Sequence, residues 1–248
     1  MGTDPRFTPH RALTPYYQKE EEKQAFLRSI FDESAAHYER IAGWGFFGTG
    51  NWYRRQALMR AGLRAGMHVV DVAAGTGITA RAAAKIVGGP EYVTCVDPSL
   101  GMLQESERQL QARHVQGSAD SIPLPDEAFD FVSMGFALRH VENLKSAFTE
   151  FGRVLRPGGK LLIMDVTKPK GRLAARFTRL YFRDIMPRFA RLLTGSKKAG
   201  YLMEYYWETM DQMVDPERVL DALASSGWEQ PRRHVVGSIF SEYTAMKR

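Results

Sequence analysis

The chain has 248 residues, a length that suits one α/β domain with additional helices. Its content of 44% hydrophobic and 25% charged residues is typical of a globular protein, and no apolar run is long enough to cross a bilayer. The net charge of +6 comes without zinc-ligand spacing and without aromatic residues set among basic ones, so we expect neither a metal site nor nucleic-acid binding.

The cysteine content indicates a reducing compartment. The single cysteine, Cys95, lies inside an apolar strand pattern, and this excludes a disulfide framework. Residues 1–22 contain no apolar signal-peptide core. Both observations predict a cytoplasmic protein.

Two parts of the chain differ in their hydrophobic pattern. Residues 1–64 are helical in pattern from residue 20 onward and are predicted to form an N-terminal helical lid segment. Residues 65–248 alternate strand and helix patterns. This alternation predicts a cofactor-binding domain with a Rossmann-like, doubly wound α/β fold and a mostly parallel sheet.

The second part contains five expected strands separated by helices. The strands are expected at 68–72, 92–96, 114–116, 129–134 and 160–166. The helices are expected at 78–87, 100–112 and 142–155, and another begins at Asp215 and Pro216. Two late strands, 229–236 and 239–246, are expected to form an antiparallel C-terminal edge.

Residues 171–213 form a helical insert after the fifth strand. Because ligands of open α/β sheets bind beyond the carboxyl ends of the strands, the insert and the N-terminal segment are expected to cover a site there. Basic and apolar residues of the insert recur at helical spacing on separate faces: Arg172, Arg176, Arg179 and Arg183, and Leu173, Phe177, Leu180 and Tyr181. This pattern fits a solvated arginine face above a core-facing apolar stripe, or peripheral contact with an anionic membrane.

The nine residues from Val70 to Ile78, VDVAAGTGI, indicate a strand, a tight turn and the start of a helix. Gly75 and Gly77 let a ligand approach the backbone, and free N–H groups at a helix start favour a polar or anionic ligand group. Asp97 ends the second strand, where a carboxylate can hold both hydroxyls of a ribose. A nucleoside-containing cofactor is therefore predicted.

Two cofactors fit this turn. The spacing from Gly75 to Ala80 meets the loose dinucleotide pattern G-x-G-x-x-A, so a nicotinamide cofactor and dehydrogenase activity stay open. Asp71 favours S-adenosylmethionine (SAM), because its carboxylate would oppose a pyrophosphate but suit an ammonium or sulfonium group. The loop from Ala73 to Gly77 is also one residue broader than the dinucleotide turn.

Five motifs occur in a familiar order. They are Asp71–Gly77, Val96-Asp97-Pro98 with Met102, Gly117–Leu124, Phe136–Val141 and Val154–Lys160. With these motifs the chain resembles the class I SAM-dependent methyltransferases and is similar, among them, to the UbiE-like ubiquinone/menaquinone C-methyltransferases.

The resemblance implies a set of cofactor-binding residues. Those implied to hold the methionine end are Ala73, Gly75, Thr76, Gly77, Met134 and Gly135, with Arg54 or Arg55 pairing with its carboxylate. Those implied to hold the nucleoside are Asp97, Pro98, Met102, Ser118 and Ala119, with Tyr38 closing over the cofactor.

Arg139 and His140 are the candidate catalytic residues. Methylation of a phenol or quinol requires proton loss, and a histidine with a pKa near neutral could take that proton. Arg139 could stabilise the resulting phenolate. His140 stands where the family usually has asparagine. An aromatic wall is also expected near the methyl group, with candidates Phe46, Phe47, Trp52, Phe136, Tyr205, Tyr206 and Trp207.

The expected activity is methyl transfer to carbon or oxygen of a small quinol, phenol or polyketide-like acceptor. Besides the dehydrogenase activity named above, two alternatives stay open. They are N-methylation of a phospholipid headgroup and a SAM-binding protein without methyltransferase activity. The sequence does not indicate an oligomeric state.

Overall fold

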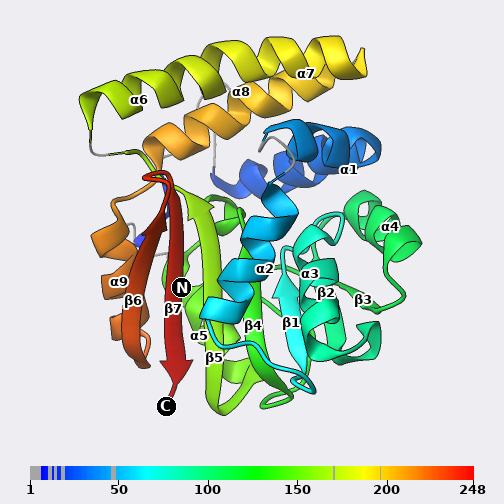
Figure 1. Cartoon of the computed structure of the whole chain (residues 1–248), viewed down its shortest axis with the longest axis vertical. Helices are drawn as coiled ribbons and strands as arrows, with labels where there is room; N and C mark the ends of the chain where they lie inside the picture. The colour runs from blue at the N-terminus through cyan, green and yellow to red at the C-terminus, as the bar shows by residue number, and fades with distance from the viewer. Residues whose placement is uncertain are drawn as a thin grey trace.

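The computed structural model of the protein describes residues 7–10, 13, 16–17, 20–45, 49–169, 171–195 and 197–248. Its strands are β1 (Val69–Val72), β2 (Val93–Asp97), β3 (Arg113–Gln116), β4 (Phe129–Gly135), β5 (Leu155–Val166), β6 (Trp228–Val236) and β7 (Phe240–Lys247). They form one sheet in the order β3-β2-β1-β4-β5-β7-β6 (Figure 1).

The pairing of the strands confirms the predicted fold class. Every pair of adjacent strands among β1 to β5 is parallel. Strand β7 runs antiparallel to both of its neighbours, β5 and β6. The antiparallel C-terminal edge expected from residues 229–246 is therefore present. The five parallel strands bring their carboxyl ends to one edge of the sheet, which is where a ligand site is expected.

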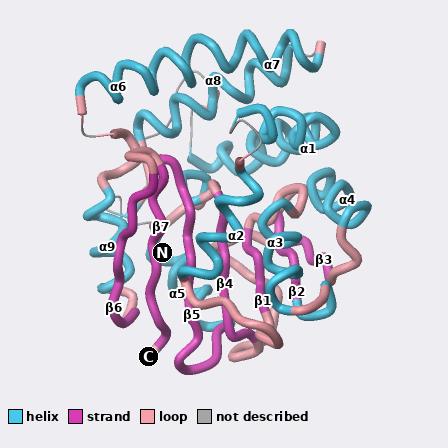
Figure 2. The backbone as a smooth tube through the Cα atoms, viewed as in Figure 1, coloured by secondary structure: helices cyan, strands magenta, loops and turns pink. Residues whose placement is uncertain are grey.

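Helices cover both faces of the sheet (Figure 2). Those that follow the strands are α3 (Ile78–Val87), α4 (Leu100–Gln109), α5 (Leu144–Val154) and α9 (Pro216–Ser225), and α2 (Gly50–Arg60) precedes β1. One apolar core lies between the sheet and α5 and α9, and the other lies between the sheet and α2 and α3. Alternate strand residues, such as Val132 and Phe131, face the two cores.

Local sequence signals explain several helix ends. The Ser99 hydroxyl caps α4 by accepting the Met102 N–H at 3.1 Å. The Asn143 side chain caps α5 by accepting the N–H of Lys145 and Ser146 at 2.9 and 3.2 Å. Gly88 ends α3 with a φ of 110°, a conformation that favours glycine.

One element begins earlier than predicted. The strand expected at 160–166 is β5, which starts at Leu155; Leu155 pairs with Phe129 before the register shifts. Gly158, with a φ of +76°, provides the irregular backbone at this point. The proline and the two glycines lie between the pairs Phe129–Leu155 and Phe131–Lys160, so they form an irregular excursion of the strand that does not pair with β4.

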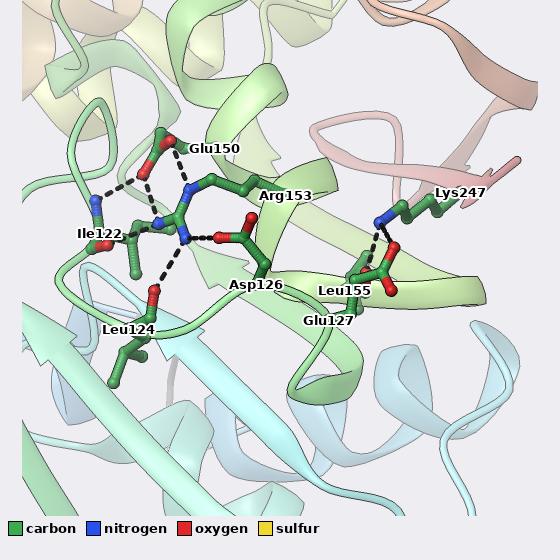
Figure 3. Close-up of polar contacts among 8 residues, drawn as sticks. All are labelled: Ile122, Leu124, Asp126, Glu127, Glu150, Arg153, Leu155 and Lys247. Atoms are coloured by element: carbon green, nitrogen blue, oxygen red, sulfur yellow. Dashed lines mark hydrogen bonds and ion pairs between the residues drawn. The ribbon is translucent and has the colours of Figure 1, made fainter.

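Arg153 of α5 fixes the loop that follows β3 (Figure 3). Its guanidinium donates to the carbonyl oxygens of Ile122 and Leu124 at 2.7 and 2.8 Å. It also donates to the carboxylates of Asp126 at 2.6 Å and Glu150 at 2.8 Å. This loop contains Ser118 and Ala119, so Arg153 positions one side of the predicted cofactor site.

Further helices lie beyond the carboxyl ends of the parallel strands (Figure 1). They are α1 (Glu20–Gly45), α6 (Arg172–Arg179), the π-helical segment η4 (Leu180–Ile185), α7 (Met186–Thr194) and α8 (Lys197–Gln212). Ile30 of α1, Met186 of α7 and Leu202 of α8 share an apolar cluster. The N-terminal segment and the insert thus meet over one end of the sheet. None of the described helices is long and apolar enough to cross a membrane.

Candidate active site

A pocket lies at the carboxyl ends of β1, β2 and β4, beneath α1. Helix α1 contributes Gln24, Leu27, Arg28, Phe31 and Tyr38 to its lining. The loops after the strands and the start of α4 contribute Ala73, Gly75, Asp97, Pro98, Ser99, Met102, Ser118, Ala119, Asp120, Gly135, Phe136, Ala137, His140 and Val141.

The pocket brings together most of the residues predicted from the sequence. Those that line it are Tyr38, Ala73, Gly75, Asp97, Pro98, Met102, Ser118, Ala119, Gly135 and His140. Those that do not line it are Arg54, Asp71, Thr76, Gly77, Met134 and Arg139, although each belongs to or adjoins an element that does. Met134 packs inside the core instead.

The turn after β1 exposes its backbone as the glycines predict. Ala73, Gly75 and Gly77 have φ values of 54°, 56° and 80°, all in the left-handed region. A Cβ on Gly75 would meet no atom within 4 Å, so the space beside it is open. The backbone here can therefore approach a ligand directly.

Asp97 ends β2 with its carboxylate held in place by the backbone. One oxygen accepts the Gly75 N–H at 2.8 Å and the other accepts the Ser99 N–H at 2.9 Å. Each oxygen keeps a further lone pair for a hydroxyl donor. Burial raises the pKa of Asp97 to about 6. The carboxylate is thus oriented for a sugar diol and is ionised at neutral pH.

Asp32 ties helix α1 to the nucleoside side of the pocket. Its carboxylate accepts hydrogen bonds from the Ser99 hydroxyl and from the Gly101 N–H, the latter at 2.9 Å. Ser99 in turn caps α4, which presents Met102 to the pocket. The position of α1 over the pocket is therefore linked to the residues that would contact an adenosine.

Opposite charges are buried at the other end of the site. Asp71 accepts the Ser133 hydroxyl at 2.6 Å, while its second carboxylate oxygen has no hydrogen-bond partner among the described residues. Burial raises the pKa of this carboxyl to about 7. The Arg54 guanidinium lies 4.7 Å above the Phe136 ring, and its buried Nε also lacks a partner there.

These groups fit SAM. A carboxylate and a guanidinium with unused hydrogen-bonding atoms match the ammonium and carboxylate of a methionine end. The Asp97 carboxylate and the apolar Met102 match a ribose and an adenine. Arg55, the alternative to Arg54, is exposed.

His140 lies at the pocket wall among aromatic rings. Its imidazole stacks on Tyr205 at 5.7 Å and meets the Phe31 ring edge-on at 5.4 Å, and its Nδ1 is buried without a hydrogen-bond partner among the described residues. Burial, together with Arg139, lowers the pKa of His140 well below its usual value. The expectation that this histidine titrates near neutral pH is therefore wrong, and the ring is neutral at physiological pH.

Arg139 lies behind the pocket wall. It is 1% exposed and donates through Nη1 to Asp165 at 2.6 Å. Its guanidinium also lies 3.8 Å from the centre of the Tyr206 ring. This placement links the ends of β4 and β5 to helix α8 and leaves Arg139 outside the residues that line the pocket, with its Nε and Nη2 lacking a hydrogen-bond partner among the described residues.

Of the aromatic candidates, Phe136 lines the pocket. Phe46 and Phe47 lie outside the described residues, and Trp52 is 65% exposed. Tyr205, Tyr206 and Trp207 belong to α8, where Tyr205 supports His140 and Tyr206 covers Arg139. The contacts of Tyr205 and Tyr206 join α8 to the residues that follow β4.

The sequence pattern does not indicate several residues of the wall. Leu27 and Phe31 line the pocket from α1, and the Lys23 ammonium donates to the Val141 carbonyl at 3.1 Å. A helical pattern predicts that this segment packs on something, but which residues face the pocket depends on how α1 crosses the sheet edge. The heptad-like spacing of Lys23, Leu27 and Ile30 is the signal that marks this buried side.

Comparison with known proteins identifies the family of the chain. Residues 17–247 match the model of the ubiE/COQ5 methyltransferase family. The chain is 32% identical over 217 residues to the ubiquinone/menaquinone biosynthesis C-methyltransferase UbiE of Shewanella piezotolerans, with 85% of each chain covered. It is 31% identical over 231 residues to the UbiE of Shewanella woodyi, covering 90% of this chain and 91% of that one.

Solved structures share the fold. A SAM-dependent methyltransferase from Thermotoga maritima, described as a possible histamine N-methyltransferase, has a TM-score of 0.63 at 19% identity and covers 89% of this chain and 99% of its own. Phosphoethanolamine N-methyltransferase 2 of Haemonchus contortus, in complex with SAM, has a TM-score of 0.61 at 18% identity. The match covers 87% of this chain and 57% of the Haemonchus chain. The family match and the identity to the UbiE proteins show that the chain belongs to the ubiE/COQ5 methyltransferase family and is a SAM-dependent methyltransferase.

Proposed function

We propose that the enzyme transfers the methyl group of SAM to a ring carbon of a quinol. The Shewanella relatives are named as C-methyltransferases of ubiquinone and menaquinone biosynthesis. The observation that carries the proposal for this chain is the buried, neutral imidazole of His140, which lines the pocket together with the apolar side chains of Leu27, Phe31, Phe136 and Val141. Such a wall suits a flat, uncharged ring with a hydroxyl group.

His140 is placed to accept the hydrogen of that hydroxyl. Its Nδ1 is buried with no hydrogen-bond partner among the described residues, so an acceptor hydroxyl can donate to it without displacing a protein group. The rings of Phe31 and Tyr205 hold the imidazole in one orientation. This geometry supports His140 as the residue that contacts the reacting hydroxyl.

Arg139 is assigned a positioning role. It is paired with Asp165 and covered by Tyr206, so its charge acts on the acceptor through His140 and through the local field. Its positive charge lowers the pKa of His140 and favours negative charge on a nearby oxygen. The pair of residues therefore assists loss of the proton without Arg139 touching the acceptor.

The placement of these residues defines which bonds form and break during methyl transfer. When bound, SAM supplies an electrophilic methyl group and leaves as a neutral thioether. The chain's own residues orient the ring and exclude water, and His140 accepts the hydroxyl hydrogen as the ring carbon gains a carbon–carbon bond. Loss of the proton from that ring carbon then restores the aromatic ring. One of the two protons returns to the hydroxyl oxygen, so one proton per methyl transfer passes to solvent.

The weakness of this base favours an electron-rich acceptor. A histidine with a pKa well below its usual value removes the proton of a phenol only weakly, so little negative charge builds up on the phenol oxygen and the ring itself must be nucleophilic. A quinol, with two electron-donating hydroxyls, meets this need better than a simple phenol. An amine would instead need only deprotonation by solvent and gains nothing from the apolar wall.

Incubation with isotopically labelled SAM tests the proposal. The panel contains a demethylated short-chain quinol, its oxidised quinone, a simple phenol and phosphatidylethanolamine, and products are read by mass spectrometry. We expect label on a ring carbon of the quinol, with the quinone unreacted because it lacks the donating hydroxyls. Label on oxygen, or on the amine of the phospholipid, would contradict the proposal.

A further inference from the structure

The outermost helical layer of the lid has an exposed apolar stripe. Helix α6, segment η4 and helix α7 run together across the top of the molecule, farther from the sheet than α8 (Figure 1). Leu173, Phe177 and Leu180 are 87%, 68% and 50% exposed, and Leu192 is 83% exposed. The expectation that this apolar stripe packs on the core is therefore wrong for Leu173, Phe177 and Leu180, whereas Tyr181, its fourth residue, is partly buried against the apolar clusters.

The π-helical segment keeps these residues on one side. At about 100° per residue, Ile185 would lie roughly 120° from Leu173 around a regular α-helix. One extra residue in a π-helical turn removes about 100° of this offset, so Ile185 and then Leu192 return to the side of Leu173. Ile185 is 46% exposed, as this geometry requires. The opposite side packs inward through Phe182 and other buried residues.

The same layer holds most of the excess positive charge of the chain. Residues 171–195 contain six arginines and one aspartate, a formal charge of +5, against +6 for the whole chain. Arg172, Arg176 and Arg179 are exposed and make no ion pair among the described residues. Their helical spacing places them along one flank of the apolar stripe.

We propose that α6, η4 and α7 form a docking surface for an anionic membrane. The arginines would meet lipid phosphates while Leu173, Phe177 and Leu192 enter the boundary between headgroups and acyl chains. A second copy of the chain fits poorly, because a two-fold contact would place one strongly basic face against another. Phosphate-binding alone would leave the exposed leucines and phenylalanine without a role.

The docking surface lies directly above the helix that closes the site. α7 packs on α8, and Tyr205 of α8 stacks on His140 at the pocket wall. A membrane-bound lid layer would therefore hold the pocket next to a lipid phase. The inference stands on the exposed stripe and its charge, and it does not depend on the identity of the methyl acceptor.

Co-sedimentation of the full chain with vesicles tests the surface. One set of vesicles is phosphatidylcholine, and the other contains about one third phosphatidylglycerol. We expect binding to the anionic vesicles, loss of binding in high salt, and little binding to phosphatidylcholine. The triple variant Arg172→Gln, Arg176→Gln, Arg179→Gln should bind about 100-fold more weakly, because each basic residue at an anionic surface contributes a factor of about five.

A second variant tests the apolar stripe. Replacing Leu173, Phe177 and Leu192 by serine should weaken binding at least 10-fold while leaving the circular dichroism spectrum unchanged, because these side chains are exposed.

Matched controls remove the same groups from other faces. Lys85→Gln, Arg113→Gln and Arg218→Gln together remove three exposed charges outside the lid, and Met59→Ser with Val235→Ser removes exposed apolar groups. Both controls should bind vesicles like the wild type. Absence of wild-type binding, or equal losses in the controls, would overturn the proposal. A dimer in sedimentation equilibrium that the serine variant dissociates would assign the stripe to a second copy instead.

Discussion

The imidazole of His140 stacks on the ring of Tyr205, with centroids 5.7 Å apart and planes at 18°. His140 follows β4 through the short helix η3 (Leu138–His140), whereas Tyr205 belongs to α8 of the insert. The contact joins the carboxyl end of the sheet to the lid. A movement of α8 would therefore change the surroundings of an imidazole that lines the pocket.

Replacing His140 by phenylalanine separates its chemistry from its packing. The aromatic ring preserves the stack on Tyr205, but the nitrogen that accepts the acceptor hydroxyl is lost. We expect turnover to fall about 10²- to 10⁴-fold, the usual contribution of a general base, with SAM affinity unchanged. Steady-state kinetics and calorimetric titration with SAM measure the two effects.

The matched control for that variant is Tyr205→Phe, which keeps the stacking surface beneath the imidazole. It should retain a turnover close to that of the wild type. Wild-type turnover in His140→Phe would show that the imidazole takes no part in the reaction.

Asp97 predicts a pH dependence of SAM binding. Burial raises its pKa to about 6, so its carboxylate is ionised above pH 7 and becomes protonated as the pH falls below 6. The ionised form is the better acceptor for ribose hydroxyls, and the dissociation constant should therefore rise, approaching tenfold per pH unit below pH 6. The same raised pKa means that ionisation of Asp97 costs folding stability, and this cost disappears as the pH falls from 6 toward 4.

Calorimetric titration of SAM between pH 5 and 8 measures this dependence. Asp97→Asn should bind weakly at every pH and lose the dependence. If the variant kept the wild-type slope, the titrating group would be Asp71, whose pKa is raised to about 7.

The cofactor half of the site was predictable because short local signals encode it. The turn from Ala73 to Gly77 and the position of Asp97 depend on strand ends and glycines that are close in the sequence. Parallel strands then bring those ends to one edge of the sheet whatever the rest of the chain does. The same reasoning placed the strands within one or two residues, apart from the early start of β5.

The acceptor half was harder because distant helices build it. Whether Arg139 faces the pocket depends on Asp165, which is 26 positions away, and on Tyr206 in the insert. The pKa of His140 depends on its burial by Phe31 and Tyr205, which come from opposite ends of the chain. Sequence spacing alone carries no information on such long-range contacts.

Arg153 should be important for stability and for the cofactor loop. Its guanidinium is shared by two backbone carbonyls and two carboxylates, and it is 29% exposed. Hydrogen bonds to charged groups contribute about 1.5–3 kcal/mol, so Arg153→Ala should lower the free energy of unfolding by about 2–3 kcal/mol. Because the loop carries Ser118 and Ala119, SAM affinity should fall as well.

Urea denaturation and SAM titration measure these two losses. Arg156→Ala is the control, because it removes a single ion pair, with Asp130 near the start of β4. That variant should lose less than about 1 kcal/mol and bind SAM normally. Equal effects in both variants would show that Arg153 has no specific role in holding the loop.

The buried pair of Arg139 and Asp165 predicts strong coupling between two substitutions. Both side chains are almost fully buried and their atoms approach to 2.6 Å. Arg139→Met should destabilise the fold by about 3–5 kcal/mol, because it leaves the Asp165 carboxylate buried without its partner. Asp165→Asn in the same chain removes that charge, and the double variant should be more stable than Arg139→Met alone.

Urea denaturation of both single variants and the double variant measures the coupling free energy between the two side chains. The exposed pair of Lys168 and Asp211, whose atoms are 3.0 Å apart, is the control and should show a coupling of less than about 1 kcal/mol in the same cycle. Additive losses at Arg139 and Asp165 would mean that the two charges do not depend on each other, and the rigid link from β4 and β5 to α8 would then need another explanation.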